Sequence, residues 1–327
     1  MSVVVVTGAA GYIGGQCALQ LHDAGHRVIG IDRRPRPRHL DYVMDFVQAD
    51  FASDQSYIKI IQHRPDAIIH CAGTSLVGPS ISNPQDYYNN NVVKTLNLLN
   101  IVLNALPKIR FIFSSSASVY GTPLLTPCHE VDPREPISPY GESKMMIEQA
   151  LASYHRAYNL DYVAFRYFNA CGADPRARHG QEPGATHIIA RVLESIRDNQ
   201  EFTLYGNNYP TPDGTCVRDY VHVSDIAQAH VLALSKDIPA GIYNLGSNTG
   251  TSNHEIIVAA ERVTGKPVQV AVGENRAGDP AILTASADRF NQLALWQRYK
   301  LDDMIQHAWN WYVQKNFKNE KILHPAV

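Results

Sequence analysis

The stretch Val3-Val4-Val5-Val6-Thr7-Gly8-Ala9-Ala10-Gly11-Tyr12-Ile13-Gly14 decides how this chain begins to fold. The four valines predict a strand that is buried on both faces, and the helical periodicity of residues 12–25 predicts a helix directly after it. The glycines between these elements are spaced Gly-x-x-Gly-x-x-Gly. Such a tight turn needs residues without a Cβ atom, and a pyrophosphate can then lie against the N-terminus of the helix.

Strand-like runs alternate with amphipathic stretches through the first half of the chain. This alternation is typical of a parallel sheet whose strands are connected by crossover helices, so we predict an α/β fold with a doubly wound parallel sheet. Ser138 is a suitable N-cap, with Pro139 at the first position of the helix that should follow it. The other expected strands are residues 27–31, 46–49, 67–70, 110–114 and 161–166, and the other expected helices are 53–63 and 84–106.

The pattern changes near Cys171, where residues 174–184 are rich in Pro, Arg and Gly and have no periodicity. We therefore predict two domains: residues 1–170, with the doubly wound sheet, and a smaller α/β domain, residues 171–327. Within the second domain we expect helices near 224–235, 253–264 and 302–317, a strand near 242–245, and a loop at 207–215.

The composition excludes several classes of protein. The 327 residues carry 29 Lys and Arg against 31 Asp and Glu, a net charge of −2. Proteins that bind nucleic acids or membrane surfaces usually need a basic field, so we expect neither partner. No apolar run approaches the roughly 18 residues of a membrane span.

The cysteines indicate a reducing compartment. They are odd in number, widely separated, and form no Cys-x-x-Cys pair. This usage predicts free thiols, a cytoplasmic location, no disulfide scaffold and no metal framework. The five are Cys17, Cys71, Cys128, Cys171 and Cys216.

Asp32 ends the second expected strand, 18 residues after Gly14. Its carboxylate suits the 2′-hydroxyl of an adenosine ribose and repels a 2′-phosphate, which favours NAD over NADP as cofactor. The segment Arg33–Arg38 adds four arginines directly after it. These either form a solvated turn or hold a 2′-phosphate, and the sequence leaves both interpretations open.

Tyr140 and Lys144 stand at i and i+4 of the helix expected after Ser138, and therefore on one face. A tyrosine titrates near pH 10, but the neighbouring ammonium and a positively charged nicotinamide both favour its phenolate form. Lowering the pKa by about three units requires roughly 4 kcal/mol of differential stabilisation. Ser116, at the end of an expected strand, would bridge the phenolate and a substrate hydroxyl. We therefore expect Tyr140, Lys144 and Ser116 to be catalytic.

These motifs resemble the extended short-chain dehydrogenase/reductases, and more closely the UDP-glucose 4-epimerase family, over nearly the whole chain. The resemblance implies a Rossmann-type cofactor domain, to which residues 221–236 return, and a C-terminal nucleotide-sugar domain. The matching stretches, besides the glycine loop, are Phe113–Gly121 (FSSSASVYG), Ser138–Lys144 (SPYGESK), Arg166–Asn169 (RYFN), Tyr209–Val223 (YPTPDGTCVRDYVHV) and Arg276–Ala281 (RAGDPA).

The resemblance also implies the reaction, which is the NAD-dependent interconversion of UDP-glucose and UDP-galactose in a homodimeric enzyme. Tyr140 would take the C4 hydroxyl proton, a hydride would pass from C4 to NAD, and the 4-keto sugar would rotate before both return. The cofactor-binding residues it implies are Gly8, Gly11, Tyr12, Ile13, Gly14, Asp32, Asp50, Phe51, Ala72, Gly73, Asn91, Ser114, Tyr140, Lys144 and Tyr167. The substrate-binding residues it implies are Ser116, Tyr140, Asn169, His187, Ile188, Thr203, Tyr205, Arg218, Arg276 and Asp279.

Three alternatives remain open. One is a 4-epimerase of another UDP-sugar, N-acetylated or pentose, since Leu283 matches a position whose size controls sugar breadth and leucine is intermediate. A second is a dehydratase or decarboxylase, although Ala117 and Ser118 stand where dehydratases carry acidic residues. The third is a non-catalytic NAD sensor, against which the intact Ser116, Tyr140 and Lys144 argue.

Overall fold

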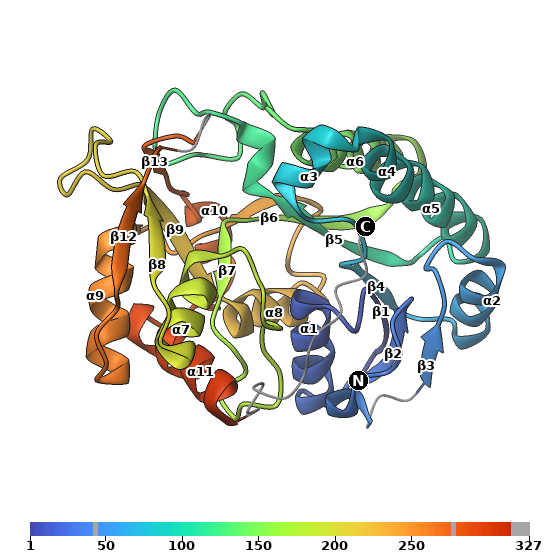
Figure 1. The fold of residues 1–327 in the computed structure, drawn as a ribbon. Helices are drawn as coiled ribbons and strands as arrows, with labels where there is room; N and C mark the ends of the chain where they lie inside the picture. The colour runs from blue at the N-terminus through green and yellow to red at the C-terminus, as the bar shows by residue number, and fades with distance from the viewer. Residues whose placement is uncertain (42–44, 276–278, 315–327) are drawn as a thin grey trace.

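A seven-stranded parallel sheet forms the centre of the larger layer of the molecule (Figure 1). The computed structural model describes residues 1–41, 45–275 and 279–314. The strand order is β10-β6-β5-β4-β1-β2-β3, and every neighbouring pair is parallel. The predicted doubly wound parallel sheet is thus confirmed. The strands are β1 (Val3–Thr7), β2 (Arg27–Asp32), β3 (Asp45–Gln48), β4 (Ala67–His70), β5 (Arg110–Ser116), β6 (Asp161–Tyr167) and β10 (Gly241–Leu245).

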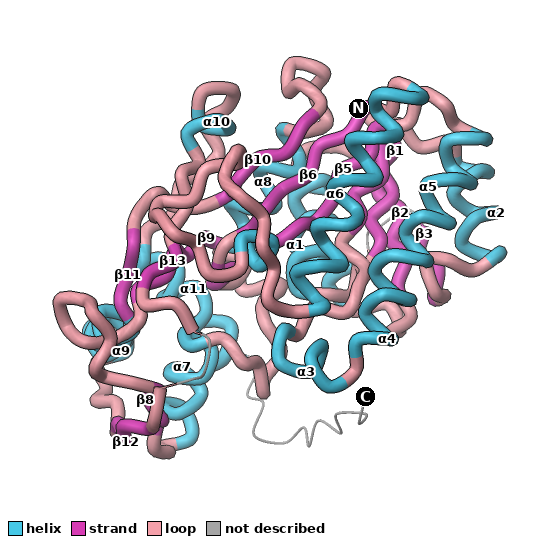
Figure 2. The backbone as a smooth tube through the Cα atoms, turned by 90° about the horizontal axis from the view of Figure 1, so that it is seen from above, coloured by secondary structure: helices cyan, strands magenta, loops and turns pink. Residues whose placement is uncertain are grey.

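Helices cover both faces of this sheet, which explains the unbroken apolar strand at the start of the chain. Val4 and Val6 pack against α1 (Tyr12–Asp23) and α8 (Val223–Leu232), whereas Val5 packs on the opposite face. Figure 2 shows the helices of that opposite face lying side by side. They are α2 (Asp54–His63), α5 (Lys94–Ala105) and α6 (Pro139–Tyr158).

Local signals in the sequence place the ends of these helices. The Ser138 hydroxyl accepts a hydrogen bond from the Gly141 N–H at 3.2 Å, so α6 begins at Pro139 as predicted. After α1, Gly25 has a φ of +81°, a conformation that glycine adopts without strain.

The predicted helix over residues 84–106 is wrong in its middle. The structure has a short α4 (Pro84–Tyr87), a π-helical segment η2 (Tyr88–Val93) and then α5. A π-turn inserts an extra residue, which turns Asn91 inward, where it is buried. The apolar periodicity of a sequence does not reveal one inserted residue. Helix α3 (Val77–Ser82), directly before α4, was also not predicted.

A smaller layer with its own apolar core lies beside the sheet (Figure 1). Its three longer helices pack on one another, and α9 and α11 lie close to the expected positions. Helix α7 and the strands of this layer were not predicted. The elements are α7 (Ile188–Asp198), α9 (Asn253–Thr264), α11 (Leu301–Gln314), β7 (Asn169–Cys171), β8 (Phe202–Tyr205), β9 (Val217–His222), β11 (Gly250–Ser252), β12 (Val270–Gly273) and β13 (Ile282–Leu283), with short turns η1 (Arg38–Leu40), η3 (Ala117–Tyr120) and α10 (Asp288–Asn291) elsewhere.

The chain passes between the two layers more than once. Helix α8 packs on α1, and β10 then pairs with β6 from Gly241 to Leu245, so residues 223–245 lie with the large sheet. The division into domains at residue 170 stays a prediction.

Buried histidines and carboxyls make the stability of this core depend on pH. Burial lowers the pKa values of His70, His222 and His230 to about 3, about 3 and about 4. Because an unfolded histidine titrates near 6.5, each stabilises the fold above that pH and loses this contribution as the pH falls. Burial raises the pKa values of Asp219 and Asp225 to about 6, so their contribution is present at acid pH and lost as the pH rises through 6.

We expect acidification to destabilise the protein. Between about pH 7.5 and pH 5, each histidine costs on the order of 2 kcal/mol and each of the two carboxyls gives back about 1.4 kcal/mol. The free energy of unfolding should therefore fall by a few kcal/mol, and the midpoint of thermal unfolding should fall with it. A midpoint that is unchanged or higher at pH 5 would contradict this balance.

Candidate active site

One long cleft runs along the carboxyl ends of the sheet strands and continues into the smaller layer. Its volume is about 2220 Å³, whereas a site for one small ligand usually measures roughly 300–1,000 Å³. Gly8 of the glycine loop, Tyr140 of α6 and Arg218 of β9 all line it. The cleft therefore has room for two nucleotide-sized ligands, with Tyr140 between its two ends.

The glycine loop forms the floor of the first end of the cleft. Gly8 has a φ of +69°, and a Cβ there would lie 2.7 Å from the Ala72 backbone nitrogen. A Cβ on Gly14 would overlap the carbonyl oxygen of Gly8. The turn between β1 and α1 therefore has no space for side chains at these two positions, and the start of α1 is left open to a phosphate, as a dinucleotide cofactor requires.

Asp32 lies at the same end, with its carboxylate held in place by backbone donors. Oδ2 accepts from the Ala10 N–H and Oδ1 from the Arg34 N–H, both at 2.9 Å. The Arg34 Nε is 3.4 Å from Oδ1, so the first charge of the arginine segment is paired with Asp32 itself. The other arginines, Arg33, Arg36 and Arg38, also line the cleft. This end therefore holds both a carboxylate that repels a 2′-phosphate and arginines that would attract one.

Tyr140, Ser116 and Lys144 meet at the middle of the cleft. The Ser116 side chain at the end of β5 lies near the Tyr140 phenol, whose pKa it lowers, and its hydroxyl donates to the Ser118 hydroxyl at 3.1 Å. One turn along α6, the Lys144 Nζ lies 5.8 Å from the centre of the Tyr140 ring and donates to the Ser114 carbonyl at 2.8 Å. The predicted trio is therefore brought together.

Burial dominates the electrostatics of this trio. It raises the pKa of Tyr140, and the nearby Ser116 side chain opposes that rise. Burial also lowers the pKa of Lys144 to about 8. The Lys144 ammonium is directed at the Ser114 carbonyl oxygen. From the protein's own groups the pKa of Tyr140 is therefore raised, and the expectation that this ammonium and a positively charged nicotinamide together favour the phenolate stays a prediction.

The second end of the cleft is formed by the smaller layer. On β9, the Arg218 Nη2 lies 3.4 Å from the Asp279 Oδ1, and Asn169 donates to the Asp219 carbonyl at 2.9 Å. A guanidinium paired with an exposed carboxylate suits the diphosphate and ribose of a nucleotide. Arg276 lies outside the described residues. The other predicted substrate residues that line this end are His187, Ile188, Thr203 and Tyr205.

Most of the predicted cofactor residues line the cleft, but four do not. Asp50 pairs with Lys94 at 2.6 Å, and Asn91 is bonded to the backbone of Thr74 and to the Ser143 hydroxyl. Ser114 and Lys144 are the other two. Those that line it are Gly8, Gly11, Tyr12, Ile13, Gly14, Asp32, Phe51, Ala72, Gly73, Tyr140 and Tyr167.

Sequence reasoning missed Arg191, which lines the cleft from the first turn of α7, one turn after His187. Its position beside the predicted substrate residues His187 and Ile188 suits a phosphate. The apolar periodicity of residues 188–198 was the signal that could have placed it.

Comparisons with known proteins agree with this geometry. The sequence profile of the NAD dependent epimerase/dehydratase family matches residues 4–246. The chain belongs to this family. It is 41% identical over 319 residues to the UDP-glucose 4-epimerase of Halalkalibacterium halodurans, covering 94% of this chain and 95% of that protein.

Solved structures of UDP-glucose 4-epimerases share the fold of this chain. The UDP-glucose 4-epimerase of Stenotrophomonas maltophila, with bound NAD and formylated UDP-arabinopyranose, superimposes with a TM-score of 0.91 at 32% identity over 96% of this chain and 99% of that one. The Bifidobacterium longum UDP-glucose 4-epimerase, in complex with NAD+ and UDP, gives 0.88 at 33% identity over 95% and 98%. Among residues 1–41, 45–275 and 279–314, no helix combines the length and apolar composition needed to cross a membrane.

Proposed function

We propose that this protein catalyses the NAD-dependent interconversion of UDP-glucose and UDP-galactose. The observation that carries the proposal is the single cleft that joins the glycine loop, Tyr140 and Arg218. A dinucleotide at one end and a nucleotide sugar at the other would place the sugar beside the Tyr140 hydroxyl. The close relative from H. halodurans and the two solved neighbours support the same assignment.

The glycine loop and Asp32 would hold the adenosine and pyrophosphate of NAD, and Tyr167 would face its nicotinamide half. When bound, NAD⁺ supplies the hydride acceptor for C4 of the sugar and the positive charge that stabilises the Tyr140 phenolate. Lys144, bonded to the Ser114 carbonyl, would fix the strand end against which that half of the cofactor lies.

Tyr140 acts as the general base toward the C4 hydroxyl, and Ser116, whose side chain lies near the phenol, would orient that hydroxyl. Arg218 binds the diphosphate and Asp279 a ribose hydroxyl, so the nucleotide is held while the 4-keto sugar turns its other face to Tyr140. Return of the hydride to the other face of C4, with the proton going back to the same oxygen, would invert the configuration at C4.

The reaction is tested by mass spectrometry of the nucleotide released from the purified protein and by a panel of UDP-sugars. We expect NAD, and interconversion of UDP-glucose and UDP-galactose. Release of NADP would assign the arginine segment to a 2′-phosphate, and a 4-keto-6-deoxy product would replace the epimerase assignment with a dehydratase.

A second candidate, a 4-epimerase of an N-acetylated or pentose UDP-sugar, is favoured by one observation. Leu283 of β13 lines the cleft directly beside Arg218, with which it is in register. Its side chain is therefore placed to limit the size of a bound sugar. Including UDP-N-acetylglucosamine in the same panel tests this candidate. If it is turned over as fast as UDP-glucose, the protein has the broader activity.

We also propose a homodimer in the cytoplasm. The five cysteines are free thiols, as a reducing compartment maintains them. Ile81, Val93 and Met146, on α3, η2 and α6, are 66%, 49% and 41% exposed on adjoining elements, which gives a second copy an apolar contact. A sedimentation mass near the 36.3 kDa of one chain would contradict the dimer.

A further inference from the structure

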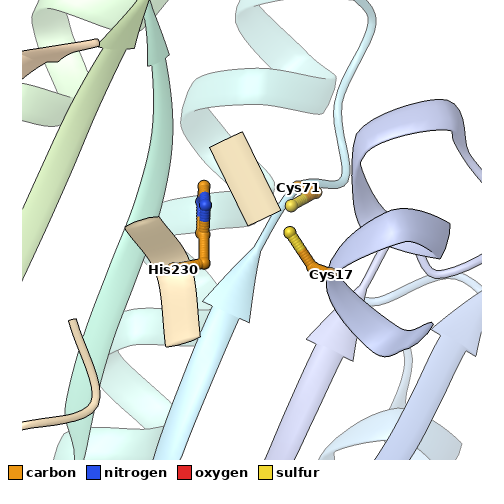
Figure 3. Close-up of side chains that lie close together, drawn as sticks. All are labelled: Cys17, Cys71 and His230. Atoms are coloured by element: carbon orange, nitrogen blue, oxygen red, sulfur yellow. The ribbon is translucent and has the colours of Figure 1, made fainter. Parts of the chain in front are cut away.

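Two cysteines and a histidine that are far apart in the sequence meet beneath the middle of the cleft (Figure 3). Cys17 belongs to α1, Cys71 directly follows β4, and His230 belongs to α8. The sulfur atoms of the two cysteines point toward one another, with the imidazole beside them. Their three ligand atoms all lie within 4.8 Å of one another. Helices α1 and α8 pack on the same face of the sheet, which is why these side chains converge.

The spacing of these atoms is close to that of a tetrahedral metal site. Zinc–sulfur bonds of about 2.3 Å and zinc–nitrogen bonds of about 2.0 Å place neighbouring ligands roughly 3.5–3.8 Å apart. A shift of about 1 Å or less would therefore bring all three ligands onto one ion. Thiolates and imidazole are the ligands that soft d¹⁰ cations select.

The imidazole is oriented for ligation. His230 Nδ1 lies 2.8 Å from the Ile226 carbonyl, which can accept but not donate, so the proton is on Nδ1 and Nε2 carries a lone pair. A hydrogen bond of this kind fixes the tautomer in metal-ligating histidines. Nε2 now accepts from the Tyr167 hydroxyl at 2.7 Å. Tyr167 in turn lies 2.9 Å from the Ser114 Oγ, which is 3.1 Å from the Cys71 Sγ.

We propose that Cys17, Cys71 and His230 form a binding site for a soft divalent cation of the zinc type, with the hydroxyl of Ser114 or Tyr167 as fourth ligand. Binding releases the two thiol protons, so two thiolates neutralise the dication and no net charge is added beside Lys144. Cys17 and His230 are fully buried, whereas Cys71 lines the cleft and gives the ion its path of entry.

Occupancy would separate Tyr167 from its acceptor, because one lone pair on Nε2 cannot serve both. Freeing Tyr167 in this way should change turnover, because the proposed function places Tyr167 beside the nicotinamide. That effect therefore rests on the proposed function. Metal binding itself does not depend on that function, so it is measured directly and without substrate.

The test titrates the purified protein with Cd²⁺, following thiolate-to-metal charge-transfer absorbance, and with Zn²⁺ by equilibrium dialysis. We expect one ion per chain and a loss of affinity of at least about tenfold in Cys17→Ala, which leaves the cleft lining unchanged. Cys128→Ala is the matched control, because this cysteine is equally buried but lies in a different core cluster. No stoichiometric binding, or equal affinity in Cys17→Ala and wild type, would overturn the site.

A second measurement keeps the proposal testable if the Cys17 variant does not fold. In the wild-type protein, bound Zn²⁺ should protect Cys71, which lines the cleft, from alkylation, and removal of the metal by a chelator should expose it again at the former rate. Peptide mapping identifies the protected thiols. Protection of other cysteines, or none, contradicts the assignment.

Discussion

Replacing Tyr140 with phenylalanine is expected to reduce turnover by about 10²- to 10⁴-fold, which corresponds to roughly 3–5 kcal/mol of transition-state stabilisation. The variant keeps the ring and its edge-to-face contact with Tyr87, at 6.4 Å between centroids, and loses the hydroxyl near Ser116. The effect should therefore appear in kcat, with the affinity for UDP and the amount of bound NAD close to those of the wild type. A coupled assay with UDP-galactose and a UDP-binding isotherm measure the two quantities.

Tyr154→Phe is the matched control for this experiment. Tyr154 is on the same helix, α6, and its hydroxyl donates to Asn100 at 2.8 Å on the surface, away from the cleft. The control should retain wild-type turnover. If Tyr140→Phe were as active as Tyr154→Phe, the general base would have to be a different group.

Replacing Gly14 with alanine is expected to remove most of the bound cofactor. The new Cβ would overlap the Gly8 carbonyl oxygen, a backbone atom of the turn, so α1 and the loop must separate. Overpacking of this kind costs about 1–3 kcal/mol, and each 1.4 kcal/mol lost from binding is about tenfold in affinity. Because α1 would supply the N–H groups that face the pyrophosphate, its displacement should act on stability and on cofactor retention together.

The measurement is the ratio of released NAD to protein, with the midpoint of thermal unfolding recorded beside it. At about 2–4 °C per kcal/mol, the range for chains of 150–250 residues, the midpoint should fall by several degrees. Gly78→Ala is the control, since a Cβ at that position in α3 meets no atom within 4 Å. Full NAD content at an unchanged midpoint in Gly14→Ala would show that the loop tolerates the side chain and that its tightness is not required.

The sequence determined those features whose residues are close together along the chain. The four valines, the glycine loop and Asp32 follow one another within the first βαβ unit, so their order alone predicts the sheet and the cofactor end of the cleft. Tyr140 and Lys144 are one helical turn apart, and Ser138 with Pro139 places the start of that helix. Short separations of this kind are set by backbone geometry, which repeats in every strand and helix.

Only the tertiary structure decided the features that depend on distant contacts. The π-turn at Tyr88–Val93 turns Asn91 toward Thr74 and Ser143, and no periodicity announces it. The pKa of Tyr140 depends on how deeply the packed helices bury it, which residue identity alone does not show. The meeting of Cys17, Cys71 and His230 required two helices to pack on one sheet face. Desolvation and ligand geometry depend on distances in space, and the spacing of residues along a chain does not contain those distances.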